Sequence, residues 1–503
     1  MNRLPDYGYI EEALLTLNRR LTRRALKAAL GEEPAASDYG IYEQYEGLLR
    51  PDIIAGIHDT MDGSKRATRL FHTLLGHYLQ YRTLPYENEL STWMRRAVAQ
   101  INGEKIYLKD VHSWCQKGSD LEGRRLMEKE TSSLSKFLKP FALSPWENIL
   151  GILEDELGYE DYVAYCEDKK RVGYASQAAS LLELLQNTGS LYFGAMDEWA
   201  RASLGIPLSA SNRFDAIYLV GLGEFDNLLP NRTPLTGHLD FFSHWQMDIS
   251  RLNGLHLVTD YSPRKGSQGV TFALAIPRDI HVVMNTQGGW IDLETLFHEM
   301  GHALSNIFTS ADLPPFEKDF NTSSTLSEAY AFLIQNMCFE PSFLERQLGL
   351  KDKDIETIVH YKALKDMAFF RRYAAKFLAE YRMFKEKSME DGGIYASMLE
   401  EQTGFSYKPE TQLFDLAPEL YSLDYVMAWM AEVSIAKALS GSLGAEWMFK
   451  REAGEILREW WRSGNRDDLG VFLLKEGMGP INSSDITDRW ITRIGAERPV
   501  QNA

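Results

Sequence analysis

The chain has 503 residues, of which 44% are hydrophobic, 12% aromatic and 25% charged. This balance is typical of a globular protein that is folded nearly throughout, and it excludes a disordered or fibrous chain. With 54 Lys and Arg against 71 Asp and Glu, the formal net charge of −17 disfavours broad attraction to nucleic acid or anionic lipid. The cysteines, Cys115, Cys166 and Cys338, are scattered without a CxxC spacing, so we expect free thiols and a cytoplasmic protein.

The first part of the chain is predicted to be helical. The N-terminus carries acidic residues where a signal peptide needs an apolar stretch, and no window offers the roughly 18 apolar residues of a membrane span. From the start to about Trp199, apolar residues recur every three or four positions, which is typical of amphipathic helices. We therefore expect an N-terminal helical domain over residues 1–205 and no membrane partner.

Short β-branched runs between about Phe214 and Asn285 predict a small sheet, since Gly, Pro and Asp separate them. The runs are AIYLVGL (216–222), LHLVTDY (255–261), VTFALAI (270–276) and IHVVMN (280–285). Helical periodicity returns after Ile291. The expected fold is therefore mainly α, with a second domain over 206–503 that contains the small sheet.

The segment WIDLETLFHEMGHALSNIF (290–308) contains an HExxH motif, formed by His298, Glu299 and His302. Apolar residues at helical spacing predict that it lies on a buried helix, with Asp292 as the N-cap. One turn apart, the two imidazoles can bind one tetrahedral Zn²⁺, and Glu299 can act as general base for the water that attacks a carbonyl. The alternative is a helix with two ordinary core histidines.

A catalytic zinc usually has three protein ligands, so a third ligand is expected downstream. Glu317 and Asp319 lie in a proline-containing segment, whereas Glu328 lies in STLSEAYAFLIQNM, a second helical pattern that can pack across the first. We predict Glu328 as the third ligand, with Glu317 and Asp319 as alternatives. A three-histidine site is disfavoured because Ser305 and Phe308 stand where HExxHxxGxxH has glycine and histidine.

The string TLFHEMGHAL resembles the signature of the thimet oligopeptidase and oligoendopeptidase F family, peptidase family M3, whose usual form is HEFGHALH. PRDIHVVMN followed by DLETLFHE resembles the same family's edge strand leading into the zinc helix. The resemblance extends weakly from Arg264 to the end. It implies that His298, His302 and Glu328 bind one Zn²⁺ per chain and that Glu299 is the general base. It also implies a multi-helix peptidase body with a small sheet beside the zinc helix and a deep substrate channel.

The resemblance further predicts tyrosines that stabilise an oxyanion from a late helix. In LYSLDYVMAWMAEV, Tyr421 and Tyr425 lie four residues apart on one helical face, and a phenol can donate a hydrogen bond to a tetrahedral oxyanion. We favour Tyr425, with Tyr421 assisting; the alternative is that both are core residues. The sequence has Met427 and Ala428 where the family typically has another tyrosine, and Gln335 where it commonly has glutamate.

These features together predict a zinc-dependent metallopeptidase that hydrolyses peptide bonds within short peptides. The strand 280–285 is expected to offer an exposed edge that binds a peptide backbone. One alternative is a carboxypeptidase or dipeptidyl carboxypeptidase of the same gluzincin group. Another is a non-catalytic relative that retains metal and binds peptides. No nucleic-acid partner is expected, and the oligomeric state is left open.

Overall fold

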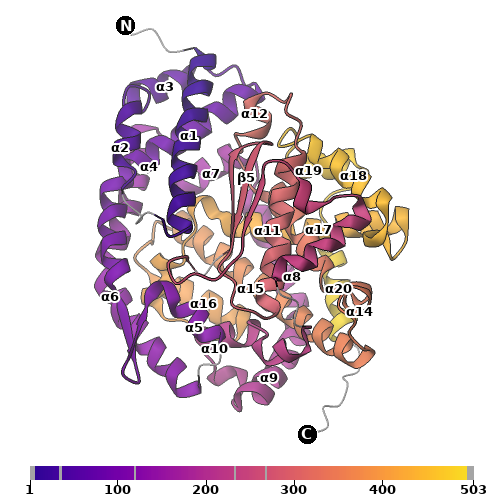
Figure 1. Ribbon diagram of the computed structural model, residues 1–503. Helices are drawn as coiled ribbons and strands as arrows, with labels where there is room; N and C mark the ends of the chain where they lie inside the picture. Colours follow the sequence, from indigo (N-terminus) through magenta and orange to yellow (C-terminus); the bar gives the residue numbers. More distant parts are fainter. Residues whose placement is uncertain (1–5, 33–36, 118–119, 231–233, 267–268, 496–503) are drawn as a thin grey trace.

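The computed structural model describes residues 6–32, 37–117, 120–230, 234–266 and 269–495 (Figure 1). Over these residues the protein is mainly α-helical and contains two small sheets, which confirms the predicted fold class. No described helix is both long and apolar enough to cross a membrane. The three cysteines are buried, and none of them forms a disulfide with another described residue.

The first of the N-terminal helices, drawn in indigo and purple, lie along one side of the molecule in Figure 1. A β-hairpin of β1 (Val98–Ile101) and β2 (Glu104–Tyr107) interrupts them. The helices are α1 (Tyr7–Ala29), α2 (Tyr39–Tyr42), α3 (Pro51–Thr60), α4 (Lys65–Arg96), α5 (Val111–Gln116), α6 (Leu121–Gly151), α7 (Tyr162–Lys170), α8 (Tyr174–Asn187) and α9 (Gly189–Leu204).

The run 216–222 is not a strand, and that prediction was wrong. It lies mostly in helix α10 (Arg213–Val220), which begins with a capping box. The Asn212 side chain accepts hydrogen bonds from the backbone N–H groups of Phe214 and Asp215, and the Asp215 carboxylate accepts the N–H of Asn212 at 2.9 Å. These bonds satisfy donors that a helix start leaves open, so they favour the helix over the β preference of the residues that follow.

The other three runs form the second sheet, from β3 (Leu255–Val258), β4 (Val270–Ala275) and β5 (Asp279–Val283). The strand order is β3-β5-β4, with β3 parallel and β4 antiparallel to β5. β5 is therefore the central strand, and the expectation of an exposed edge at 280–285 was wrong. Among the described residues the unpaired edges belong to β3 and β4.

The sheet lies between the N-terminal helix α1 and helix α11 (Trp290–Phe308), as Figure 1 shows. Helix α11 packs on α13 (Thr325–Met337), which packs in turn on α17 (Tyr421–Leu443). The remaining helices are α12 (Pro315–Lys318), α14 (Pro341–Arg346), α15 (Asp352–Lys385), α16 (Gly392–Thr403), α18 (Arg451–Arg462), α19 (Leu469–Lys475) and α20 (Ser483–Ile494).

One large apolar cluster joins these elements and contains side chains from both sides of residue 205, including Leu14, Leu75, Leu296 and Phe377. The division into domains 1–205 and 206–503 stays a prediction. The elements that position the site are packed in the order α1, the sheet, α11, α13 and α17. Such a close-packed stack holds its side chains in fixed positions.

Candidate active site

Helix α11 carries the HExxH motif next to the sheet. It begins at Trp290, after Gly289 with φ of 91°. The prediction of Asp292 as the N-cap was wrong, because Asp292 lies in the first turn. Its carboxylate instead accepts the backbone N–H groups of Gln287 and Gly288 and so fixes the loop that leads from β5 into the helix.

The structure brings His298, His302 and Glu328 together, with one ligand atom of each lying within 4.8 Å of the others. His298 Nε2 is 3.5 Å from Glu328 Oε2, and His302 Nε2 is 3.6 Å from Glu328 Oε1. Ligand atoms at about 2.1 Å from a tetrahedral zinc lie about 3.4 Å apart. The alternative ligand Glu317 instead pairs with Arg466 at 3.0 Å, and Asp319 is not in the cluster.

The buried carboxylate of Glu328 also fits a metal ligand. Its side chain is only 8% exposed, and Oε2 has no hydrogen-bond partner among the described residues. A buried carboxylate oxygen without a donor is costly unless a cation reaches it. Two imidazole nitrogens and one carboxylate are a usual donor set for catalytic zinc. The described residues therefore fit one Zn²⁺ at this position.

The electrostatics of the cluster favour a positive charge. Burial alone would lower the pKa of His298, but the nearby Glu328 carboxylate outweighs it and raises that pKa to about 9. Burial would raise the pKa of Glu328, but the charges of His302 and His298 and the hydrogen bond from Tyr421 lower it to about 2. A carboxylate held ionised beside two imidazoles is a site prepared for a cation.

Neighbouring side chains orient both histidines through their Nδ1 atoms. His302 Nδ1 lies 2.8 Å from Ser327 Oγ, and His298 Nδ1 lies 2.8 Å from Gln335 Oε1. Gln335 in turn donates to Glu294 Oε1 at 2.8 Å, and Glu294 pairs with the buried Lys365. Because each Nδ1 has a partner, each Nε2 is left to face the cluster.

Gly301 sets the distance between α11 and α13. A Cβ at this position would lie 2.5 Å from the Cα of Ala331 and 2.9 Å from the carbonyl oxygen of Tyr330. We expect Gly301→Ala to push α13 and Glu328 away from the histidines, to lower stability by about 1–3 kcal/mol and to weaken metal binding. Thermal unfolding and zinc titration measure both effects.

Gly441→Ala is the matched control, because this exposed glycine in α17 has open space around it. Alanine there should be neutral or should stabilise the helix by up to about 1 kcal/mol. Equal behaviour of the two variants would contradict the close-approach role of Gly301.

Glu299 points to the sheet side of α11 and is 7% exposed. Thr271 on β4 donates its hydroxyl to Glu299 Oε2 at 2.7 Å and lies 3.1 Å from the Glu299 carbonyl oxygen. A carboxylate that is held by one oxygen keeps its other oxygen for a proton. Thr271 could not be predicted as a site residue from the sequence, because its contact with Glu299 is set by how β4 packs on α11.

The two predicted tyrosines lie beside the cluster on α17. The Tyr421 hydroxyl donates to Glu328 Oε1 at 2.5 Å. The Tyr425 ring lies 6.5 Å from the His298 ring and 4.6 Å from the ring of Tyr373 on α15. The Tyr425 hydroxyl has no hydrogen-bond partner within the described part of the chain. Burial raises the pKa of both phenols, so both stay protonated donors.

The segment before α17 holds Tyr421 in place through two residues in the left-handed region, Glu419 with φ of 58° and Leu420 with φ of 51°. Such a backbone is costly for residues with a side chain and persists only where contacts enforce it. The Glu419 carboxylate accepts Lys169 Nζ at 2.6 Å, and its carbonyl accepts Lys170 Nζ at 2.5 Å. Helix α7 thus fixes the start of the tyrosine helix.

Glu380 on α15 supports the same segment and carries a pH dependence. Its carboxylate accepts the Ala417 N–H at 3.2 Å, and burial raises its pKa from 4.5 to about 7 despite Lys376. The folded state therefore holds a proton that the unfolded chain has lost, so stability falls as pH rises from about 4.5 to 7. We expect Glu380→Gln to be more stable than wild type by about 3 kcal/mol at pH 8, with the difference vanishing near pH 4.5. Thermal unfolding at both pH values measures this; equal differences at both would contradict it.

Comparison with known proteins agrees with the site. Residues 259–467 match the model of peptidase family M3, a range that contains the HExxH helix, Glu328 and both tyrosines. The predicted resemblance began near this point, at Arg264, but the match ends well before the C-terminus. No curated protein matches the chain. This segment is therefore similar to peptidase family M3, whose members are metallopeptidases that act on peptides and are in general zinc-dependent.

Proposed function

We propose that the protein is a zinc-dependent oligoendopeptidase that hydrolyses short peptides, with His298, His302 and Glu328 holding one Zn²⁺ per chain. The observation that carries this proposal is the spacing of the three ligand groups, 3.5 and 3.6 Å between the histidine nitrogens and the Glu328 oxygens. The match of residues 259–467 to peptidase family M3 supports the reaction class, and the neighbouring Glu299 supports hydrolysis.

Zn²⁺ held there would supply Lewis acidity, which activates water and polarises the scissile carbonyl. Glu299 takes the proton of the attacking water and later delivers it to the leaving amine. The 2.7 Å hydrogen bond from Thr271 holds the Glu299 carboxylate in place before substrate binds, so no entropy has to be lost to position it during the reaction.

Tyr425 is the proposed donor to the oxyanion that forms on the carbonyl. Its hydroxyl makes no hydrogen bond to another described residue, whereas the Tyr421 hydroxyl is engaged by Glu328. Tyr421 therefore assists by holding the third ligand, and Tyr425 is left for the substrate. Tyr425 thus remains the favoured oxyanion donor and Tyr421 the assisting residue, as the sequence predicted.

The β4 edge is the proposed binding place for the peptide backbone. β4 pairs with β5 on one side only, and it carries Thr271 next to Glu299. Main-chain hydrogen bonds to a strand edge bind a peptide without selecting many side chains. This assignment replaces the 280–285 strand, which lies at the centre of the sheet.

Peptide cleavage by metal-free and zinc-restored protein tests the proposal. We expect a peptide that is blocked at both ends and quenched internally to be cut only after zinc is restored. Cleavage restricted to peptides with a free C-terminus would instead support a carboxypeptidase or dipeptidyl carboxypeptidase. Tight peptide binding and stoichiometric zinc without any cleavage would support the non-catalytic alternative, and absence of stoichiometric zinc would overturn the site.

A further inference from the structure

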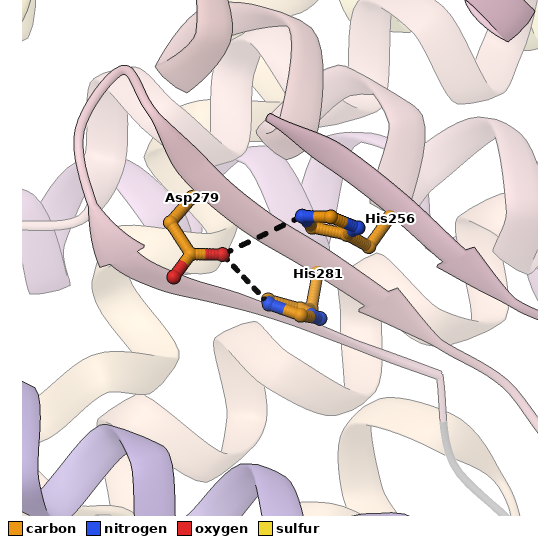
Figure 2. Close-up of side chains that lie close together, drawn as sticks. All are labelled: His256, Asp279 and His281. Carbon is orange, nitrogen blue, oxygen red and sulfur yellow. Dashed lines mark hydrogen bonds and ion pairs between the residues drawn. The ribbon is translucent and has the colours of Figure 1, made fainter. Parts of the chain in front are cut away.

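A second group of residues that could bind a metal, His256, Asp279 and His281, lies on the face of the β3-β5-β4 sheet opposite to the one that packs on α11 (Figure 2). His256 on β3 is the direct register partner of His281 on the parallel strand β5. Asp279 is two residues before His281, so its side chain lies on the same face of the sheet. The backbone register alone therefore places two imidazoles and one carboxylate together.

The contacts among these side chains are close and converge on one oxygen. Asp279 Oδ1 lies 2.8 Å from His281 Nε2 and 3.6 Å from His256 Nε2, the two dashed lines of Figure 2. The two imidazole rings stack at 4.4 Å between their centroids. One ligand atom of each residue lies within 4.8 Å of the others. In a tetrahedral site these atoms would be about 3.4 Å apart, and the ion would lie in the plane of each imidazole that binds it. Binding therefore requires the two stacked rings to turn so that their Nε2 atoms converge beside Asp279.

The group is open to solvent. The side chains of His256, Asp279 and His281 are 52%, 37% and 20% exposed. A metal ion can therefore enter without local unfolding, and the coordination positions that the three side chains leave open can take water. The strands that carry the ligands are hydrogen-bonded neighbours, so little backbone entropy is lost on binding.

We propose that His256, Asp279 and His281 form a second transition-metal site, which takes a divalent ion of the Zn²⁺, Co²⁺ or Ni²⁺ class. Two imidazoles and one carboxylate suit these ions better than Mg²⁺ or Ca²⁺, which prefer oxygen ligands. Bound metal links the short edge strand β3 to the central strand β5. The site is independent of the proposed catalytic zinc and shares no residue with it.

The surroundings predict that this site is the weaker of the two. Arg19, Arg23, Arg278 and Lys318 line an adjoining cavity of about 360 Å³ together with Asp279. These cations oppose a further positive charge, whereas the catalytic cluster is buried and holds the Glu328 carboxylate within 3.6 Å of both histidine nitrogens. We therefore expect a first zinc equivalent at the catalytic cluster and a second, weaker equivalent at the sheet.

Zinc titration of the full-length protein that already carries one equivalent tests the proposal. Calorimetry should show a second binding event. When zinc occupies the sheet site, the backbone amides of β3 should exchange hydrogen more slowly. His281→Gln and His256→Gln should each weaken the second event by at least about tenfold while leaving the first unchanged. Circular dichroism and peptide cleavage confirm that the variants are folded.

His58→Gln is the matched control, because His58 is an exposed histidine 3.8 Å from Asp59 without a second histidine. It should leave the second event unchanged. The proposal is overturned if no second equivalent binds, if the two sheet variants bind it as wild type does, or if His58→Gln loses it equally. His298→Ala should still bind zinc at His256, Asp279 and His281. An error in the catalytic assignment can therefore be told apart from an error in the assignment of the sheet site.

Discussion

Replacing Glu299 with glutamine is expected to lower kcat by about 10²- to 10⁴-fold, the usual contribution of a general base, while zinc stays bound. Glu299 does not belong to the three-residue cluster, and an amide can still accept the Thr271 hydrogen bond. What the amide cannot do is take a proton from water at neutral pH. Cleavage of a quenched peptide, together with elemental analysis of the same samples, measures both properties.

The matched control for this substitution is Glu356→Gln, which removes an exposed carboxylate on α15. It should leave both zinc content and kcat unchanged. Hydrolysis by Glu299→Gln at the wild-type rate would contradict the assignment of the base. Loss of zinc from Glu299→Gln would show that Glu299 is a ligand and that the roles in the cluster are different.

Replacing Glu328 with glutamine is expected to weaken the first zinc equivalent by more than about 100-fold, since even outer partners of metal ligands contribute about 10- to 100-fold. In the wild type the Glu328 carboxylate faces both histidines and accepts the hydrogen bond of the Tyr421 hydroxyl. Glutamine removes the negative charge of this group. Peptidase activity should be lost at stoichiometric zinc. Competition with a chromogenic chelator gives the affinity directly.

Glu317→Gln distinguishes the two candidates for the third ligand. Glu317 lies outside the cluster and pairs with Arg466. This variant should bind the first zinc equivalent as wild type does. If Glu317→Gln loses the zinc and Glu328→Gln keeps it, the arrangement of ligands described above is wrong.

The parts of the site that depend on local spacing could be predicted from the sequence. His298 and His302 are one turn apart on any helix, and the apolar residues around them indicated that the helix is buried. Glu328 required one further step, that a second helix packs across the first. Gly301 makes this packing close, because only a residue without a side chain lets α13 approach to this distance.

Contacts that depend on tertiary packing could not be predicted. Thr271, Tyr373 and Glu294 reach the site from β4, α15 and the buried side of α11, and no sequence spacing relates them to the residues they contact. Gln335 was noted as a departure from the family, but its bond to His298 appears only in the folded chain.

Two secondary-structure predictions were wrong although the sequence contained local signals for the correct structure. The β-branched run 216–222 was assigned to the sheet, although the capping pair Asn212 and Asp215 before it favours a helix. The hairpin of β1 and β2 was missed, although Asn102 and Gly103 at its turn are a strong hairpin signal, with φ of 51° and 87°. The order of strands in a sheet is a tertiary property, and it made β5 central.

The most direct test of the central claim is the position of zinc in crystals of the protein grown with one equivalent of Zn²⁺. Diffraction data collected on both sides of the zinc absorption edge locate the ion without assumptions about activity. The assignment predicts one anomalous peak per chain between His298 Nε2, His302 Nε2 and the Glu328 carboxylate, with Glu299 outside bonding distance. A peak elsewhere, or coordination that omits Glu328, would contradict it.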